Sequence, residues 1–316
     1  MKGTTLAEVR HLSRYYGDLH AVKDLSFTIR QGEILGFLGP NGAGKTTTMQ
    51  ILSGNLAPSA GSVEIAGHDL LAEPRAAKAA LGYLPEQPPV YRDLTVDEYL
   101  DYCAALHRLP RPKRRDAREA AKGKCGLADV GRRLIGNLSK GYQQRVGIAQ
   151  AIIHLPPLVI LDEPTIGLDP IQIREIRTLI RDLGKEHGVI LSTHILPEVQ
   201  ATCDRVQIIH QGTLVLSDTI DSLAHHLKSA ALLVAFRHAP APAELQKLPG
   251  VRVVSPQGDG RLRITHDPEQ NPTEQIVRLA TQHDWGLNEI GPERISLEQI
   301  FVELTTVDRT PQQATA

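Results

Sequence analysis

The chain has 316 residues, with 35 Lys and Arg against 36 Asp and Glu. This length predicts one large domain with a smaller one beside it. The nearly balanced charge excludes a global field that would attract nucleic acid or an anionic membrane, and no apolar run approaches the roughly 18 to 20 residues of a membrane helix. The three cysteines are scattered and odd in number, which fits a reducing cytoplasm rather than a zinc site or a disulfide framework.

Short apolar alternations near the N-terminus, over residues 7–10 and 21–29, predict an antiparallel β layer. Two neighbouring aromatics, Tyr15 and Tyr16, lie between them. Such an aromatic can stack on an adenine base or form a cross-strand ring pair, and the residues alone favour the ring pair.

A complete phosphate-loop pattern, G-x-x-x-x-G-K-T, runs from Gly39 to Thr46. An apolar strand is predicted before it, over 34–38, and a helix after it, over 46–52. Backbone N–H groups of the loop would surround the phosphates, the Lys45 ammonium would reach the β and γ oxygens, and the Thr46 hydroxyl is placed for Mg²⁺. The expected nucleotide-binding residues here are Gly39, Pro40, Asn41, Gly42, Ala43, Gly44, Lys45, Thr46 and Thr47.

The next stretch, residues 54–69, is rich in Gly, Pro and Ser and predicts a hairpin. From Asp97 to Gly126 the pattern is helical and includes a run of basic residues between Arg108 and Arg118. No recognition motif or interleaved aromatic accompanies this run, so it favours a solvated helix face, and no nucleic-acid partner is expected.

Two later strands end in residues suited to phosphate chemistry. The apolar run 158–161 leads into Asp162 and Glu163, of which Asp162 can bind Mg²⁺ through water and Glu163 can orient and polarise the attacking water. Another predicted strand, 189–193, ends at His194, which can hydrogen-bond a γ-phosphate or its attacking water but by itself is more often an ordinary strand-end histidine.

Beyond Asp218 the pattern changes to a small α+β domain with no catalytic motif, which predicts a role in interaction or regulation. The expected elements are a strand over 231–236, a helix over 242–248, a hairpin of 251–255 with 261–265, a helix over 273–283 and an apolar segment over 295–304. The last residues, 309–316, are expected to be a disordered tail.

The stretch Leu138-Ser139-Lys140-Gly141-Tyr142-Gln143-Gln144-Arg145, between the phosphate loop and Asp162-Glu163, resembles the signature of ABC-transporter ATPase subunits. The resemblance implies an α/β P-loop NTPase fold with a RecA-like sheet, an antiparallel β layer and a helical subdomain. It places the ATP-binding domain at 1–219, its helical subdomain at about 90–145 and the accessory α+β domain at 220–308.

The resemblance also assigns roles. Tyr16 becomes the aromatic that stacks on adenine, Asp169 belongs to the D-loop, and His194 is the switch histidine. Ser139 and Gly141 begin a helix whose N-terminus would face the γ-phosphate bound by a second ATPase subunit, either an identical chain or a close paralogue. ATP and Mg²⁺ are the implied cofactors.

Several positions depart from the usual pattern. Lys140 and Tyr142 replace the first glycine and the glutamine of the LSGGQ signature, and alignment places Glu86 at the Q-loop position, with Gln87 as the alternative Mg²⁺ ligand. These variants, with residues 296–301 near the C-terminus, are similar to the ABC-2-type exporter branch and to its gliding-motility and multidrug ATPases.

That branch implies an ATPase at the cytoplasmic face of the membrane, held there by a separate ABC-2-type permease. Two alternatives are a soluble ABC ATPase that acts on ribosomes or DNA and a protein that binds ATP without turnover. The first usually has two cassettes or a long coiled coil, and neither is present in this sequence; the second is disfavoured because Lys45, Asp162, Glu163 and His194 are all present.

Overall fold

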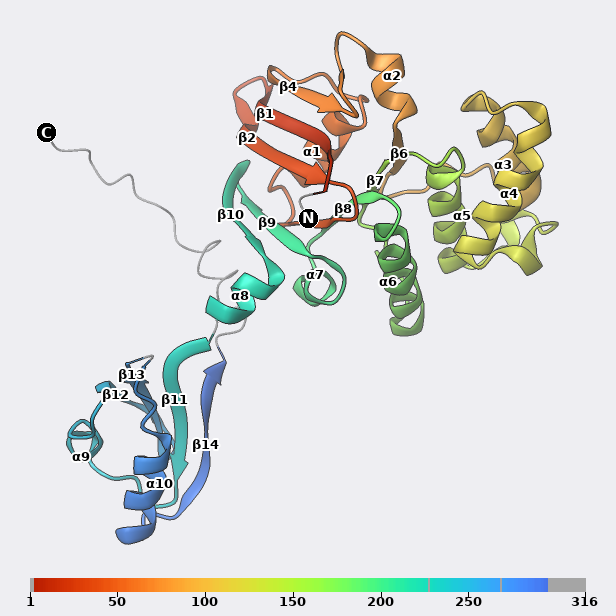
Figure 1. Cartoon of the computed structure of the whole chain (residues 1–316). Helices are drawn as coiled ribbons and strands as arrows, with labels where there is room; N and C mark the ends of the chain where they lie inside the picture. Colours follow the sequence, from red (N-terminus) through yellow and green to blue (C-terminus); the bar gives the residue numbers. More distant parts are fainter. Residues whose placement is uncertain (1–2, 227, 268, 295–316) are drawn as a thin grey trace, which may run out of the picture. The chain divides into compact units, whose positions relative to one another are not determined.

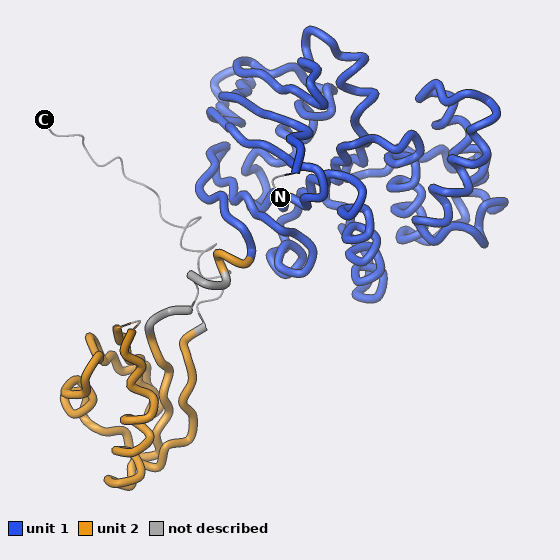
Figure 2. The backbone as a smooth tube through the Cα atoms, viewed as in Figure 1, with its two compact units in different colours: residues 1–220 blue, residues 221–316 orange. Residues whose placement is uncertain are grey.

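A computed structural model describes residues 3–226, 228–267 and 269–294, and the chain divides into two compact units, Met1–Ile220 and Asp221–Ala316 (Figure 2). Two expectations, the apolar segment over 295–304 and the disordered tail over 309–316, lie outside the described residues. Within the described part, no helix combines the length and the apolar character that a membrane span requires.

The centre of the first unit is a six-stranded sheet in the order β10-β9-β3-β8-β7-β6 (Figure 1). Its strands are β3 (Ile34–Leu38), β6 (Leu81–Leu84), β7 (Leu158–Asp162), β8 (Gly188–Thr193), β9 (Arg205–His210) and β10 (Thr213–Thr219). All pairings are parallel except that of β9 with β10. Every residue of β3, β7 and β8 is buried, because a parallel sheet is covered on both faces. The carboxyl ends of these three strands therefore share one edge.

Three helices follow these strands and pack against the sheet: α1 (Lys45–Leu52), α6 (Pro170–Gly184) and α7 (Leu196–Thr202). α1 contacts β7 and β8, and α7 contacts β3 and β8. This strand-then-helix succession places the N-termini of α1 and α7 beside the carboxyl edge of the sheet.

A second, antiparallel sheet in the order β2-β1-β4-β5 covers α1. It consists of β1 (Thr5–Tyr16), β2 (Leu19–Arg30), β4 (Ala60–Ile65) and β5 (His68–Asp69), followed by the short helix α2 (Pro74–Ala79). Val9 pairs with Phe27 on one side and Val63 on the other, and their apolar side chains join those of Phe37 and Met49 in one core. The predicted β layer and the hairpin within 54–69 are confirmed.

The helical region contains α3 (Val96–Leu106), α4 (Arg111–Cys125), α5 (Lys140–Ile152) and 3₁₀ turns at Ala128–Val130 and Ile135–Asn137. The helical pattern over 97–126 is thus two helices, interrupted before Pro110, which lacks the N–H that a continuous helix needs. α3 begins at a capping box in which Thr95 and Glu98 bond each other's backbone. At the end of the basic run, Arg118 forms an ion pair with Asp101. Lys122, one turn later on α4, forms an ion pair with Asp97. The basic face of the helix is therefore only partly solvated.

The second unit is a four-stranded antiparallel sheet in the order β12-β13-β11-β14, with three short helices among its described residues. Its elements are α8 (Ile220–His226), β11 (Lys228–Phe236), α9 (Pro242–Leu245), β12 (Val251–Gly258), β13 (Arg261–His266), α10 (Thr273–Gln282) and β14 (Leu287–Arg294). Phe236, Ile264, Ile276 and Trp285 belong to its core. The predicted small α+β fold is confirmed; β14 is an additional strand that the sequence did not reveal.

Candidate ATP site

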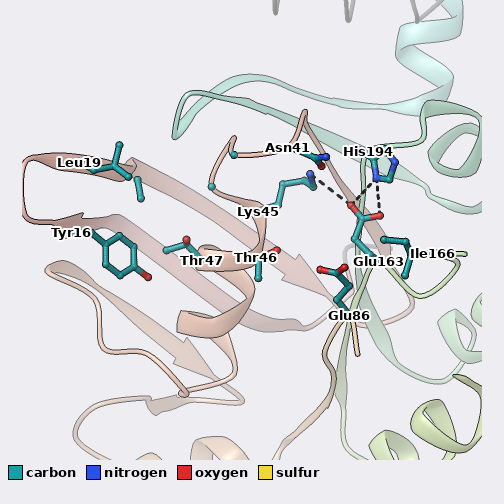
Figure 3. Close-up of a pocket in the computed structure, with 13 residues that line it drawn as sticks. Tyr16, Leu19, Asn41, Lys45, Thr46, Thr47, Glu86, Glu163, Ile166 and His194 are labelled. Carbon is teal, nitrogen blue, oxygen red and sulfur yellow. Dashed lines mark hydrogen bonds and ion pairs between the residues drawn. The ribbon is translucent and has the colours of Figure 1, made fainter. Parts of the chain in front are cut away.

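A hollow of about 600 Å³ lies at the carboxyl edge of the central sheet, between the phosphate loop and the turns that follow β7 and β8 (Figure 3). Its walls are Tyr16, Leu19, Ala21, Asn41, Gly42, Gly44, Lys45, Thr46, Thr47, Glu86, Glu163, Ile166 and His194. These residues come from distant parts of the chain and are brought together because β3, β7 and β8 end at the same edge.

Two glycines fix the shape of the phosphate loop. Gly44, the N-cap of α1, has φ of 101°, and a Cβ there would lie 2.5 Å from the Ala21 carbonyl oxygen. A Cβ at Gly39 would lie 2.4 Å from the Ile209 carbonyl oxygen. Only glycine fits both positions, and the loop can therefore direct its backbone N–H groups inward. The remaining loop residues Pro40 and Ala43 support this turn without lining the hollow.

Lys45 is the first residue of α1 and is 6% exposed. Its ammonium donates to the carbonyl oxygens of Gly39, at 2.8 Å, and Pro40, at 3.2 Å. It also lies 3.7 Å from Glu163 Oε1. Burial lowers the pKa of Lys45, while the carboxylates of Glu163 and Asp162 oppose that shift. Lys45 is therefore a desolvated cation at the N-terminus of a helix, and both features favour the binding of a phosphate.

Glu163 follows β7 and has a strained, left-handed backbone with φ of 48°. Its backbone N–H donates to the Ser192 carbonyl at 2.9 Å, which holds the turn against β8. His194 Nδ1 lies 3.0 Å from each Glu163 carboxylate oxygen (Figure 3). A non-glycine residue in this conformation costs about 1 to 3 kcal/mol, and the surrounding bonds retain it here.

The segment that carries His194 has its own support. The Thr193 hydroxyl donates to the carboxylate of Glu198, at 2.9 Å, and accepts the backbone N–H of Ile195, at 3.1 Å. Glu198 is 1% exposed and belongs to α7. The position of the histidine is therefore fixed by the following helix.

Asp162, the last residue of β7, is 1% exposed and does not line the hollow. Neither of its carboxylate oxygens has a hydrogen-bond partner among the described residues. Burial raises the pKa of Asp162, and the nearby carboxylates of Glu163 and Glu86 add to that shift. The Ser192 side chain and the Lys45 ammonium act in the opposite direction, so the charge of this buried carboxylate is only partly compensated.

At the Q-loop position, the side chain in the hollow is that of Glu86, and Gln87 does not line it. At the opposite end, Tyr16 is 42% exposed and closes the hollow together with Leu19. Tyr15 stacks instead on His20, its cross-strand partner, with ring centroids 3.9 Å apart. The cross-strand ring pair expected from the sequence alone is thus formed by Tyr15, which leaves Tyr16 at the hollow.

Three further wall residues, Leu19, Ala21 and Ile166, were not predicted from the sequence. The signal available for Leu19 was its place directly after the turn at Gly17-Asp18, opposite Tyr16. For Ile166, the only signal in the sequence was its position three residues after Glu163, which is weaker evidence for a place at the hollow.

Ser139, Gly141 and Asp169 do not line the hollow of their own chain. The Ser139 hydroxyl caps α5 by accepting the Tyr142 backbone N–H, and Asp169 Oδ1 caps α6 by accepting the N–H groups of Ile171 and Gln172. The start of α5 adjoins the start of α6, because a Cβ at Gly141 would lie 2.7 Å from the Gln172 side chain. The signature and the D-loop therefore lie side by side and outside the hollow of their own chain.

The described residues contain no group of three or more His, Cys, Asp and Glu side chains arranged to bind a metal ion. All three cysteines are buried free thiols.

Comparison with known proteins identifies relatives over nearly the whole chain. A family model described as ABC transporter matches residues 22–166. The bacitracin transport ATP-binding protein BcrA of Bacillus licheniformis is 39% identical over 304 residues, which cover 95% of this chain and 97% of that protein. The daunorubicin resistance ATP-binding protein DrrA3 of Streptomyces coeruleorubidus is 31% identical and covers 98% of this chain and 99% of its own length.

Solved structures of ABC transporter subunits are also similar to this chain. An ATP-binding subunit of an ABC transporter superposes with a TM-score of 0.64 at 32% identity, over 70% of this chain and 93% of that one. The cbiO1 protein of Clostridium perfringens, part of an ABC transporter complex, gives a TM-score of 0.64 at 29% identity, over 69% and 90%. The predicted fold is confirmed. The chain belongs to the ABC transporter family as an ATP-binding subunit of the exporter kind, an ATPase that couples ATP hydrolysis to transport.

Proposed function

We propose that this ATPase is the motor of an ABC-2-type exporter and works at the cytoplasmic face of the membrane, where a separate permease holds it. Two ATPase subunits, either two copies of this chain or this chain with a close paralogue, would close around two ATP molecules. Hydrolysis would open the pair and move the permease. The observation that carries the proposal is the separation of Lys45, Glu163 and His194, which share one hollow, from Ser139 and Gly141, which lie outside it.

Within one chain, the phosphate loop and Lys45 would bind the β- and γ-phosphates, and Tyr16 would stack on the adenine at the far end of the hollow. Glu163 would orient the attacking water and accept its proton at a carboxylate oxygen. His194, which already contacts both of those oxygens, would hold the carboxylate in place and hydrogen-bond the γ-phosphate.

The residues present also fit Mg²⁺. The buried Asp162 carboxylate lacks a donor in the described chain, while the Thr46 and Glu86 side chains line the adjacent wall. Oxygen ligands of this kind, completed by phosphate oxygens and water, are those that Mg²⁺ prefers. When bound, the ion would neutralise charge on the phosphates; Thr46 and Glu86 would bind it directly and Asp162 through water.

Hydrolysis would also need a second subunit. The N-terminus of α5 is capped by Ser139, and the backbone N–H groups of its first turn would bind an anion. Since these groups lie outside the hollow of their own chain, they would contact the γ-phosphate of an ATP bound by the partner subunit. Asp169 of the D-loop would lie at the same contact between the two subunits.

The assignment to a transporter is supported by similarity to BcrA and DrrA3 along nearly the full chain, including the second unit. Those proteins are named for bacitracin transport and daunorubicin resistance. A peptide or another drug-like molecule is therefore a reasonable class of cargo to test, although the permease rather than this chain would contact it. A role on ribosomes or DNA has no comparable support.

Mixed dimers test the composite site. Lys45→Ala removes the phosphate contact of one chain, and Ser139→Arg blocks the signature of the other, so each variant alone should be inactive. A one-to-one mixture would contain heterodimers with one intact site, and about a quarter of wild-type ATPase activity is expected if pairing is random. An inactive mixture of folded, pairing variants would contradict completion by a second chain.

A further inference from the structure

The ring of Tyr16, which lies beside Leu19 at one end of the candidate ATP site (Figure 3), has an arginine against one of its faces. Arg14 Cζ lies 4.8 Å from the centroid of the Tyr16 ring. The two residues are two positions apart on β1, so both side chains can project from the same face of the strand. A guanidinium at this distance is attracted to the π-electrons of the ring. Arg14 therefore restrains a ring that lines the hollow.

The Arg14 side chain is itself held in place. Its Nη1 donates to the Ala57 carbonyl at 3.0 Å, and its Nε is buried. The loop that contains Ala57 is joined to β1 by two further hydrogen bonds. The Ser59 backbone N–H donates to the Ser13 carbonyl at 2.8 Å, and the Tyr15 backbone N–H donates to Ser59 Oγ at 3.1 Å. The loop between α1 and β4 thus fixes the position of the guanidinium.

Arg14 does not belong to the wall of the hollow, whereas Tyr16 does. An effect of the arginine on a bound nucleotide would therefore pass through the tyrosine ring. An exposed ring next to a turn can adopt several rotamers. A ligand that needs one of them binds more weakly, in proportion to the fraction of molecules in which that rotamer is present. A cation held against one face of the ring raises that fraction.

We propose that Arg14 is a positioning residue for the nucleotide base: it holds the Tyr16 ring in the orientation whose free face receives the adenine. Guanidinium, ring and base would then form one stack. That the ligand is an adenine nucleotide rests on the proposed function, whereas the pairing of Arg14 with Tyr16 rests on the contacts described here.

Substitution of Arg14 tests the stack by equilibrium binding. Arg14→Met keeps an unbranched side chain of similar length but removes the charge and the donors. It should raise the dissociation constant of ATP about two- to fivefold, which corresponds to one partly exposed cation–π contact. The kcat at saturating ATP should not change, because the ring lies away from the reacting phosphate. Arg14→Lys, which keeps a cation, should recover part of the affinity.

The matched control is Arg10→Met. Arg10 is an exposed cation on the same strand, paired with Glu8 and absent from the wall of the hollow. This variant should bind ATP as wild type does. An equal loss of affinity in Arg10→Met and Arg14→Met would overturn the proposal, because the effect would then be one of general charge.

A double-mutant cycle shows whether Arg14 acts through the ring. Tyr16→Ala should raise the dissociation constant of ATP by about tenfold or more, since base stacking is lost. Adding Arg14→Met to Tyr16→Ala should cause no further loss, because the ring that the arginine positions is already absent. If Arg14→Met weakens binding equally with and without the ring, the two residues act independently and the proposal fails.

Tripolyphosphate, which has no base, provides the remaining control. Its ability to displace a fluorescent ATP analogue should be the same in Arg14→Met and wild type, and this result also shows that the phosphate loop is folded. Weaker tripolyphosphate binding would overturn the role in base positioning. Wild-type affinity for ATP in Tyr16→Ala would contradict the proposed adenine contact itself. A loss at Tyr16 without any loss at Arg14 would overturn only the present inference.

Discussion

Lys45 Nζ lies 3.7 Å from Glu163 Oε1, so the cation assigned to phosphate and the carboxylate assigned to water are joined as a buried ion pair. Glu163 is also held by His194. Entry of a γ-phosphate at Lys45 would compete with Glu163 for the ammonium, and would leave His194 to position the carboxylate. This relationship underlies the first two predictions.

Replacing Lys45 with Ala should weaken ATP binding by about 10- to 100-fold and abolish turnover, because the desolvated cation of the phosphate loop is removed while Glu163 remains buried and loses its ion pair. A fluorescent ATP analogue measures binding and phosphate release measures turnover. The exposed Lys113, changed to Ala, is the control and should behave as wild type. Unaltered turnover in Lys45→Ala would remove the lysine from the chemistry.

Replacing His194 with Ala should lower kcat by about a hundredfold or more with little change in KM, since its proposed partners are Glu163 and the γ-phosphate rather than the adenine. Steady-state ATPase kinetics separate the two constants. His194→Gln retains a hydrogen-bonding side chain and should recover part of kcat. A variant in which KM rises and kcat is unchanged would assign His194 to binding alone.

The Gly44→Ala substitution should destabilise the ATPase unit by about 1 to 3 kcal/mol, because φ of 101° is strained for alanine and its Cβ would meet the Ala21 carbonyl. Gly123 provides a matched control. It lies inside α4, and a Cβ added there would meet no atom of another element within 4 Å, so Gly123→Ala should stabilise by about 0.5 to 1 kcal/mol. Urea unfolding of both variants measures the difference; equal effects would contradict the loop geometry.

The half-buried His154 should make the protein less stable in mild acid. Its pKa is lowered from 6.5 to about 4 by burial, so the unfolded chain binds the proton more tightly. This contribution to stability is therefore fully present above pH 6.5 and is lost as pH falls from 6.5 toward 4, by about 1 to 3 kcal/mol. His154→Gln, which keeps a donor for the Leu81 carbonyl that His154 Nε2 contacts, should lose less stability between about pH 7 and pH 5 in urea unfolding. A loss equal to that of wild type would show that other groups dominate.

The places of the candidate site residues in the fold could be predicted because these residues follow buried strands in local patterns. Lys45, Glu163 and His194 each come shortly after an element whose apolar run is unmistakable, and the topology of a parallel sheet then brings them together. The glycines of the loop were equally predictable from the phosphate-loop pattern, and the structure shows that a side chain at Gly39 or Gly44 would meet a backbone carbonyl.

Other features required the three-dimensional structure. β14 has a polar sequence with Gly291 and Pro292 and is a strand only because it pairs with the edge of β11. Whether Glu86 or Gln87 faces the hollow depends on the backbone after β6, which no periodicity predicts. The division of Tyr15 and Tyr16 between a ring stack and the hollow depends on His20, the partner across the strand.

The most direct test of the account is the mass of the Glu163→Gln protein in solution with ATP and Mg²⁺. This variant should bind ATP without hydrolysing it and should therefore remain paired. Light scattering after gel filtration is expected to give twice the 34.6 kDa chain mass with ATP, and the added Lys45→Ala substitution should abolish that response. A mass that does not respond to ATP, in a variant shown to bind the nucleotide, would contradict a shared ATP site.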